Sequence, residues 1–97
     1  MEYLNFQWDE VKNQLNQQKH GISFEEAKSV FYDLNAIVFN DPDHSDNEDR
    51  FLIIGLTSHA RVCIVSHCYR YNDSVIRIIS ARKATKNEKK YYKRRRC

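Results

Sequence analysis

Two spacings of apolar residues predict a strand and then a helix at the start of the chain. In the run YLNFQW (3–8), Leu4, Phe6 and Trp8 alternate with polar residues, which is the period of a half-buried strand. Asp9 then offers an N-cap, and Val11 and Leu15 recur at the spacing of one helix face. Gly21 is a usual C-terminal signal. We therefore expect a helix between Asp9 and Gly21 whose apolar stripe contains Val11 and Leu15.

A second helix is predicted from Ser23 onward. Ser23 and Glu26 form a capping box, in which the serine oxygen accepts from a free amide and the Glu26 carboxylate returns to the serine amide. The apolar stripe that follows has helical spacing and consists of Phe24, Ala27, Val30 and Phe31.

Strands dominate the prediction for the rest of the chain. Residues 35–39 are β-like, and residues 40–49 form a polar loop with the only proline. Three β-branched runs follow, and the turn signals between them favour an antiparallel meander: FLIIGL (51–56), RVCIVSHCYRY (61–71) and VIRIISA (75–81). A second capping box at Thr85–Glu88 opens a last helix, and we expect residues 93–97 to fray.

This order of elements predicts an α+β fold. We expect one domain over residues 1–97, with an antiparallel sheet of four to five strands, two N-terminal helices and a C-terminal helix. No stretch has the length of a membrane span, and we find no signal peptide, so we expect a cytoplasmic protein. Cys63 and Cys68 point to opposite faces of one predicted strand, so they cannot share a metal and are interpreted as buried hydrophobes.

The charge is divided unevenly along the chain. The net charge is +3, but residues 82–97 contain nine basic residues and one acid, Glu88. Five acids fall within residues 41–49, with no lysine or arginine between the first and the last of them. A basic end suits a polyanion, such as nucleic acid or an acidic partner, although a solubilising tail has the same composition.

The predicted hairpin at Asn72–Asp73 gives a conditional register. A two-residue turn would pair His67 with Ile78, Cys68 with Arg77 and Val65 with Ser80. His67, Tyr69, Ser80 and Arg82 would then share one face of the sheet, and Arg70 and Arg77 the other. A three-residue loop would change this parity.

Arg77, Arg82 and Lys83 are candidate phosphate ligands. Arg77 interrupts an apolar run and needs an acid, solvent or a bound anion, and a salt bridge satisfies it as well as a phosphate does. Arg82 and Lys83 lie just before the free amides of the last helix, near Thr85. Together these groups predict a phosphate seat.

Metal-independent RNA cleavage needs proton carriers beside cations. The candidate carriers are His20, His44, His67 and Glu48, and the candidate cations include Arg50. His20 ends a helix, where a structural role is favoured because its cation would stabilise the helix dipole. The acids of residues 41–49 match no calcium or zinc spacing, so we expect no metal and no cofactor.

Three motifs resemble those of the BrnT toxin family. Phe6-Gln7-Trp8-Asp9 and the run KHGISFEEA (19–27) resemble the opening of these toxins. The run DPDHS (41–45), with Glu48, Arg50 and Phe51, resembles their central loop. The run RIISARKAT (77–85), with Glu88 and Tyr92, resembles their closing signature.

The resemblance implies a RelE-like fold and a type II toxin–antitoxin role. It implies a metal-independent endoribonuclease that inhibits translation and growth. The implied partner is a BrnA-like antitoxin with a ribbon-helix-helix part. The resemblance implies that the complex contacts DNA only through this part of the antitoxin. The matched positions are Lys19, His20, His44, Glu48, Arg50, Arg77, Ser80, Arg82 and Tyr92.

Within these positions we assign roles as hypotheses. Arg50, Arg77 and Arg82 are expected to bind phosphate, and Glu48 or His67 to move a proton. The expected RNA-binding residues are Lys83, Lys86, Lys89, Lys90 and Lys93. The alternatives are a non-catalytic module that binds RNA or protein through the basic end, and an inactive relative kept for its antitoxin contact.

Overall fold

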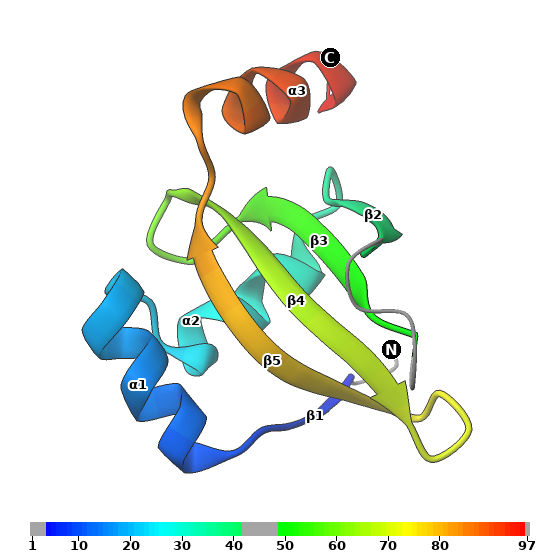
Figure 1. Ribbon diagram of the computed structural model, residues 1–97. Helices are drawn as coiled ribbons and strands as arrows, with labels where there is room; N and C mark the ends of the chain where they lie inside the picture. The colour runs from blue at the N-terminus through cyan, green and yellow to red at the C-terminus, as the bar shows by residue number, and fades with distance from the viewer. Residues whose placement is uncertain (1–3, 42–48, 97) are drawn as a thin grey trace.

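The computed structural model describes residues 4–41 and 49–96, which form an α+β fold around one five-stranded sheet (Figure 1). The strands lie in the order β1-β5-β4-β3-β2. Their bounds are Asn5–Gln7 (β1), Ile37–Asn40 (β2), Phe51–Leu56 (β3), Val62–Arg70 (β4) and Val75–Lys83 (β5). The helices are α1 (Glu10–His20), α2 (Phe24–Lys28), the 3₁₀ turn η1 (Ser29–Tyr32) and α3 (Lys86–Arg96). Within the described residues, no helix is long and apolar enough to span a membrane.

The sheet is mixed, so the expectation of a purely antiparallel sheet is wrong. Strands β2 to β5 form the predicted antiparallel meander, but β1 pairs with β5 in parallel, with Phe6 opposite Ile76. The connection from β1 runs through α1 and α2 before the chain enters the sheet again at β2, so β1 is free to join the far edge in either direction. Beyond Gln7 the edge of β5 is no longer paired with β1.

Helices α1 and α2 pack on one face of the sheet, which we call the α1/α2 face. The core on this face joins Ile22, Phe24, Ala27 and Val30 to sheet residues including Val65 and Ile78. The predicted stripe of the second helix is therefore confirmed, although the α-helix has only five residues and continues as η1. Ser23 caps α2 by accepting from the Glu26 amide at 3.0 Å.

Helix α1 buries polar side chains instead of its apolar stripe. Val11 is 68% exposed and Leu15 is 57% exposed, whereas Asn13 and Asn16 are buried. The Asn16 side chain bonds the Ala81 backbone at both its N–H and its C=O, at 3.1 and 2.9 Å. Toward Ala81 the side chain uses one N–H as donor and its C=O as acceptor, as the backbone of a neighbouring strand would, so Asn16 replaces the missing strand partner of β5. The predicted apolar stripe of Val11 and Leu15 therefore does not face the sheet, because this pairing fixes which side of α1 does.

A β-bulge in β5 changes the predicted faces. The tight turn does pair His67 with Ile78 and Cys68 with Arg77, but the register shifts between Ser66 and His67, so Ser66 pairs with Ser80 and Val65 with Ala81. The extra residue on β5 is Ile79. A single inserted residue reverses the alternation beyond it. Ser80 and Arg82 therefore lie on the same face as Arg77, and not with His67 as expected.

The opposite face of the sheet, which we call the α3 face, is covered at one end by α3. Tyr92 is 1% exposed and packs with Ile54, Ile64 and Ala84. Its hydroxyl donates to Asp33 at 2.5 Å, which ties α3 to the loop after η1. α3 extends to Arg96, so it includes most of the 93–97 segment for which fraying was predicted. In Figure 1 the helix stands at the top of the sheet, apart from α1 and α2.

Candidate active site

A groove between α1 and β5 gathers several of the residues matched to the family signature. It has a volume of about 230 Å³ and is lined by Lys12, Leu15, Asn16, Lys19, His20, Ile79 and Ser80. The five α1 residues recur at helical spacing and so share one face of the helix. Two lysines and a histidine line this groove without an acid, so its charge suits an anion.

Ser80 connects this groove to the α3 face of β5. Its side chain is exposed and lines the groove, while its position in the register places it with Arg77 and Arg82 on that face. The bulge at Ile79 produces this arrangement, because without it Ser80 would face α2. Arg77 is half-buried and makes no ion pair or hydrogen bond with another described residue. Of the two roles left open for Arg77, the internal salt bridge is therefore not observed within the described residues.

The predicted phosphate seat near α3 is filled by a carboxylate of the chain itself. Arg82 donates to both oxygens of Glu88, at 2.8 and 2.9 Å, and the Thr85 amide donates to Glu88 at 2.8 Å. The Arg82 hydrogen bonds lower the pKa of Glu88 to about 2. The capping box is thus complete, since the Thr85 hydroxyl also accepts from the Glu88 amide at 3.2 Å. A phosphate would have to displace Glu88 to reach this seat.

His67, one of the two proton carriers selected from the sequence, is enclosed in the core. It is 0% exposed, and its ring lies among those of Phe31, Phe51 and Tyr69 at centroid distances of 4.8 to 6.0 Å. Burial lowers the pKa of His67 to about 4, so the ring is neutral at pH 7. Its Nδ1 lies 3.2 Å from the Val65 carbonyl oxygen. The structure does not bring His67 to the groove, since His67 lies on the opposite face from Ser80.

The remaining predicted site residues are dispersed. Glu48 and His44 lie outside the described residues, and Arg50 is half-buried beside β3. Tyr92 is an anchor of α3, as described above. The lysines expected to bind RNA are exposed along the end of β5 and α3: Lys83, Lys86, Lys89, Lys90 and Lys93.

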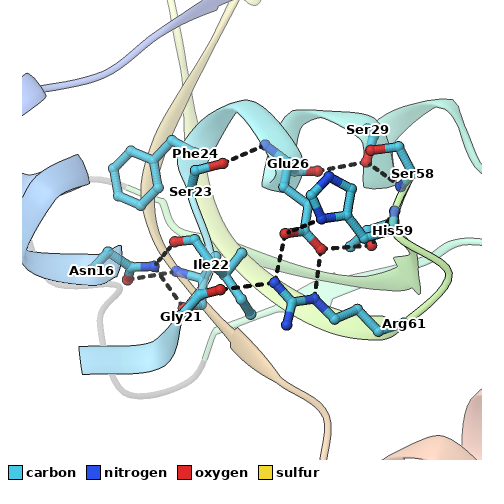
Figure 2. Close-up of polar contacts among 12 residues, drawn as sticks. Asn16, Gly21, Ile22, Ser23, Phe24, Glu26, Ser29, Ser58, His59 and Arg61 are labelled. Atoms are coloured by element: carbon cyan, nitrogen blue, oxygen red, sulfur yellow. Dashed lines mark hydrogen bonds and ion pairs between the residues drawn. The ribbon is translucent and has the colours of Figure 1, made fainter. Parts of the chain in front are cut away.

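Glu26 explains a large part of the opening signature in structural terms (Figure 2). Its side chain is 3% exposed and accepts from Arg61 at 2.7 and 2.6 Å and from the Thr57 hydroxyl at 2.8 Å. Arg61 also donates to the carbonyl of Gly21, the C-cap of α1, at 2.8 Å. The Glu26 carboxylate therefore holds the β3–β4 turn against α1 and α2. It does not return to the Ser23 amide, which corrects that half of the predicted capping box.

A larger cavity, of about 540 Å³, lies at the other end of the sheet. Its described lining is Asp49, Phe51, Tyr69 and Asp73. The two aspartates give this lining a negative charge, which disfavours a phosphate. Among residues 4–41 and 49–96, no group of three His, Cys, Asp or Glu side chains could hold a metal ion.

Comparisons with known proteins agree on one family. The family model described as the ribonuclease toxin BrnT of type II toxin–antitoxin systems matches residues 8–88. The crystal structure of the Brucella abortus ribonuclease toxin BrnT superimposes with a TM-score of 0.65 at 28% sequence identity. The match covers 87% of this chain and 100% of that one. No curated protein sequence matches the chain significantly.

Proposed function

The chain belongs to the BrnT family of ribonuclease toxins of type II toxin–antitoxin systems, and we propose that it cleaves RNA in the α1–β5 groove without a metal ion. The observation that carries this proposal is the position of His20. His20 lines the groove together with Lys12, Lys19 and Ser80. A proton carrier among cations is the minimum that cleavage through the ribose 2′-hydroxyl requires.

The proposed reaction forms a cyclic phosphate. His20 accepts the proton of the 2′-hydroxyl, the 2′ oxygen attacks phosphorus, and the bond from phosphorus to the 5′ oxygen breaks. Water protonates the departing 5′ oxygen, and the resulting hydroxide takes the proton back from His20. The products carry a 2′,3′-cyclic phosphate and a 5′-hydroxyl. Lys19 stabilises the charge that develops on the phosphate, and Ser80 donates to a phosphate oxygen.

Arg77 is proposed to bind the next phosphate along the strand. It lies on the same face of β5 as Ser80 and has no described ion-pair partner to displace. The guanidinium can hold a phosphate in a bidentate manner. The basic surface of α3 would extend the contact with the RNA backbone, and its contribution should weaken with salt. Arg82 keeps a structural part in this proposal because Glu88 already occupies its guanidinium.

The partner proposed from family membership is a BrnA-like antitoxin. A ribbon-helix-helix part of that protein would be the only contact with DNA. The RelE-type fold and the inhibition of translation in the cytoplasm are part of the same proposal. Belonging to a toxin–antitoxin family supports a protein partner and an RNA substrate for this chain.

Two matched histidine variants test the site. His20→Asn should lower RNA cleavage in EDTA by about 100-fold or more, which is the usual contribution of a general base. His59→Asn is the control, because His59 has an exposed side chain, lies beside Glu26 and does not line the groove. It should keep activity within about twofold of wild type. Equal activity of the two variants would show that His20 moves no proton.

A second pair tests the cations. Lys19→Gln and Arg77→Gln should both lower cleavage, whereas Lys28→Gln should not, since Lys28 lies on α2 and pairs with Glu25 at the surface. RNA binding without scission by the folded wild type would instead support the non-catalytic module.

A further inference from the structure

The outward side of α1 presents two apolar side chains that the core does not use. Val11 and Leu15 lie one turn apart on the helix, with exposed fractions of 68% and 57%. Single exposed apolar residues are ordinary, but this pair adjoins the groove, because Leu15 is one of its lining residues. Val11 and Leu15 therefore form a small apolar surface at the rim of the groove.

The charges around this patch define what could cover it. Lys12 is the next residue after Val11, and Lys19 lies one helical turn after Leu15. Both lysines line the groove. The groove lining contains no acid. The surface therefore combines apolar side chains with positive charge along one side of an eleven-residue helix. Its complement is a segment that carries apolar side chains and carboxylates.

We propose that an acidic amphipathic segment of the antitoxin docks along α1. Its apolar side chains would cover Val11 and Leu15, and its carboxylates would pair with Lys12 and Lys19. This inference rests on the proposed function, because it takes the antitoxin as the occupant. RNA fits the lysines but has no apolar side chain to cover Val11, so a protein segment is favoured.

This position would explain inhibition by direct competition. Leu15 and Lys19 belong both to the docking surface and to the groove in which RNA is proposed to bind. A segment seated there would exclude the RNA from His20. No change in the fold of the toxin would be needed.

A pair of peptides and a pair of variants test the inference. The probe is a fluorescein-labelled helical peptide with leucine at i, i+3, i+4 and i+7 and glutamate at most other positions, followed by fluorescence anisotropy. Its control has lysine in place of each glutamate. Val11→Glu places a negative charge in the patch, which repels the glutamates of the probe peptide. Leu34→Glu makes the same change at a residue that is 100% exposed and does not line the groove.

The glutamate peptide should bind wild type and Leu34→Glu equally, and Val11→Glu at least tenfold more weakly. The lysine peptide should not bind. Equal binding of both variants, binding of the lysine peptide, or no binding of either peptide would overturn the inference. A loss of RNA binding in Val11→Glu as large as the loss of peptide binding would assign the patch to RNA and overturn it as well.

Cleavage assays on the same proteins separate the two proposals. Val11 does not line the groove, so Val11→Glu should cleave RNA as wild type does. If the glutamate peptide binds as expected but no protein cleaves RNA, the catalytic proposal fails and the docking surface stands. If wild type cleaves RNA and the peptide results fail, only the docking surface is lost.

Discussion

Replacing Arg61 by alanine would isolate the buried carboxylate of Glu26. In the wild type, two hydrogen bonds from Arg61 and one from Thr57 satisfy this carboxylate, whose side chain is 3% exposed (Figure 2). Arg61→Ala removes two of the three bonds together with the positive charge. The remaining partners are the Thr57 hydroxyl and the imidazole of His59, whose Nδ1 lies 3.2 Å from the carboxylate.

The expected loss of stability is large for one residue. Removing one partner of a buried ion pair costs about 3–5 kcal/mol, because the other charge is left without compensation. The Arg61 side chain is 32% exposed, so water can enter the space that it leaves, and we expect the lower end of that range. For a domain of this size, about 3 kcal/mol corresponds to a fall in Tm of roughly 12–24 °C.

The loss should also depend on pH. The Arg61 hydrogen bonds hold the pKa of Glu26 below its ordinary value of 4.5, against the effect of burial. In wild type this group adds stability above pH 4.5, and that stability is lost as the pH falls through the lowered pKa. In Arg61→Ala, burial raises the pKa of Glu26 above its ordinary value. The stability that Glu26 adds is then present at low pH, where it is protonated, and is lost as the pH rises through the raised pKa. The difference between the two proteins is therefore largest near pH 7 and smaller at pH 4.

Urea unfolding at pH 7 and pH 4, followed by circular dichroism, measures both effects. Lys28→Ala is the control, because it breaks the surface pair of Lys28 with Glu25 and should cost no more than about 0.5 kcal/mol. A loss below about 1 kcal/mol for Arg61→Ala, or the same loss at both pH values, would refute this reasoning.

Three further substitutions test packing, backbone conformation and the attachment of α3. Gly55→Ala should cost about 1–3 kcal/mol in urea unfolding, because the added Cβ would lie 2.9 Å from Val30 Cγ1, and an unchanged midpoint would contradict this. Ala60→Gly should raise the free energy of unfolding by up to about 1 kcal/mol, since Ala60 has φ of 61°, and a lower value would show that this backbone carries no strain. Tyr92→Phe removes the hydrogen bond to Asp33, so it should lower the free energy of unfolding by about 1.5–3 kcal/mol and speed tryptic cleavage within α3. Cleavage at the wild-type rate would show that this bond does not hold the helix.

The local elements were predictable because their signals are local. The capping box at Thr85 and Glu88 and the left-handed C-cap at Gly21 involve residues that are close in sequence, and both are observed. The same holds for the hairpin register next to its turn, where Cys68 faces Arg77. Cys63 and Cys68 are buried on opposite faces, as expected from strand alternation.

The errors arise where residues far apart in the sequence determine the orientation or pairing of an element. Apolar spacing predicted a stripe of Val11 and Leu15 along α1. The hydrogen bonds of Asn16 to Ala81, 65 residues away, turn another side of the helix toward the sheet. The bulge at Ile79 has no recognisable signal within VIRIISA, yet it moves Ser80 to the other face. The parallel pairing of β1 depends on the path of the whole chain.

The candidate site was predictable in its residue types and not in its assembly. Lys19, His20 and Ser80 were matched to the family signature, but only the fold shows that α1 and β5 bring them into one groove. Conversely, Arg82 has the sequence context of a phosphate ligand, but in the structure its guanidinium donates to both carboxylate oxygens of Glu88. Lys12 was not predicted. Its helical spacing from Lys19, seven residues or about two turns, was the signal that could have found it.

The most direct test of the account is cleavage of a 5′-labelled RNA by the purified, antitoxin-free protein in EDTA, with analysis of the new ends. The account predicts scission that leaves 2′,3′-cyclic phosphate on one fragment and a 5′-hydroxyl on the other, and that His20→Asn abolishes. A folded protein that leaves the RNA intact in EDTA and cleaves it only after Mg²⁺ is added would contradict the account.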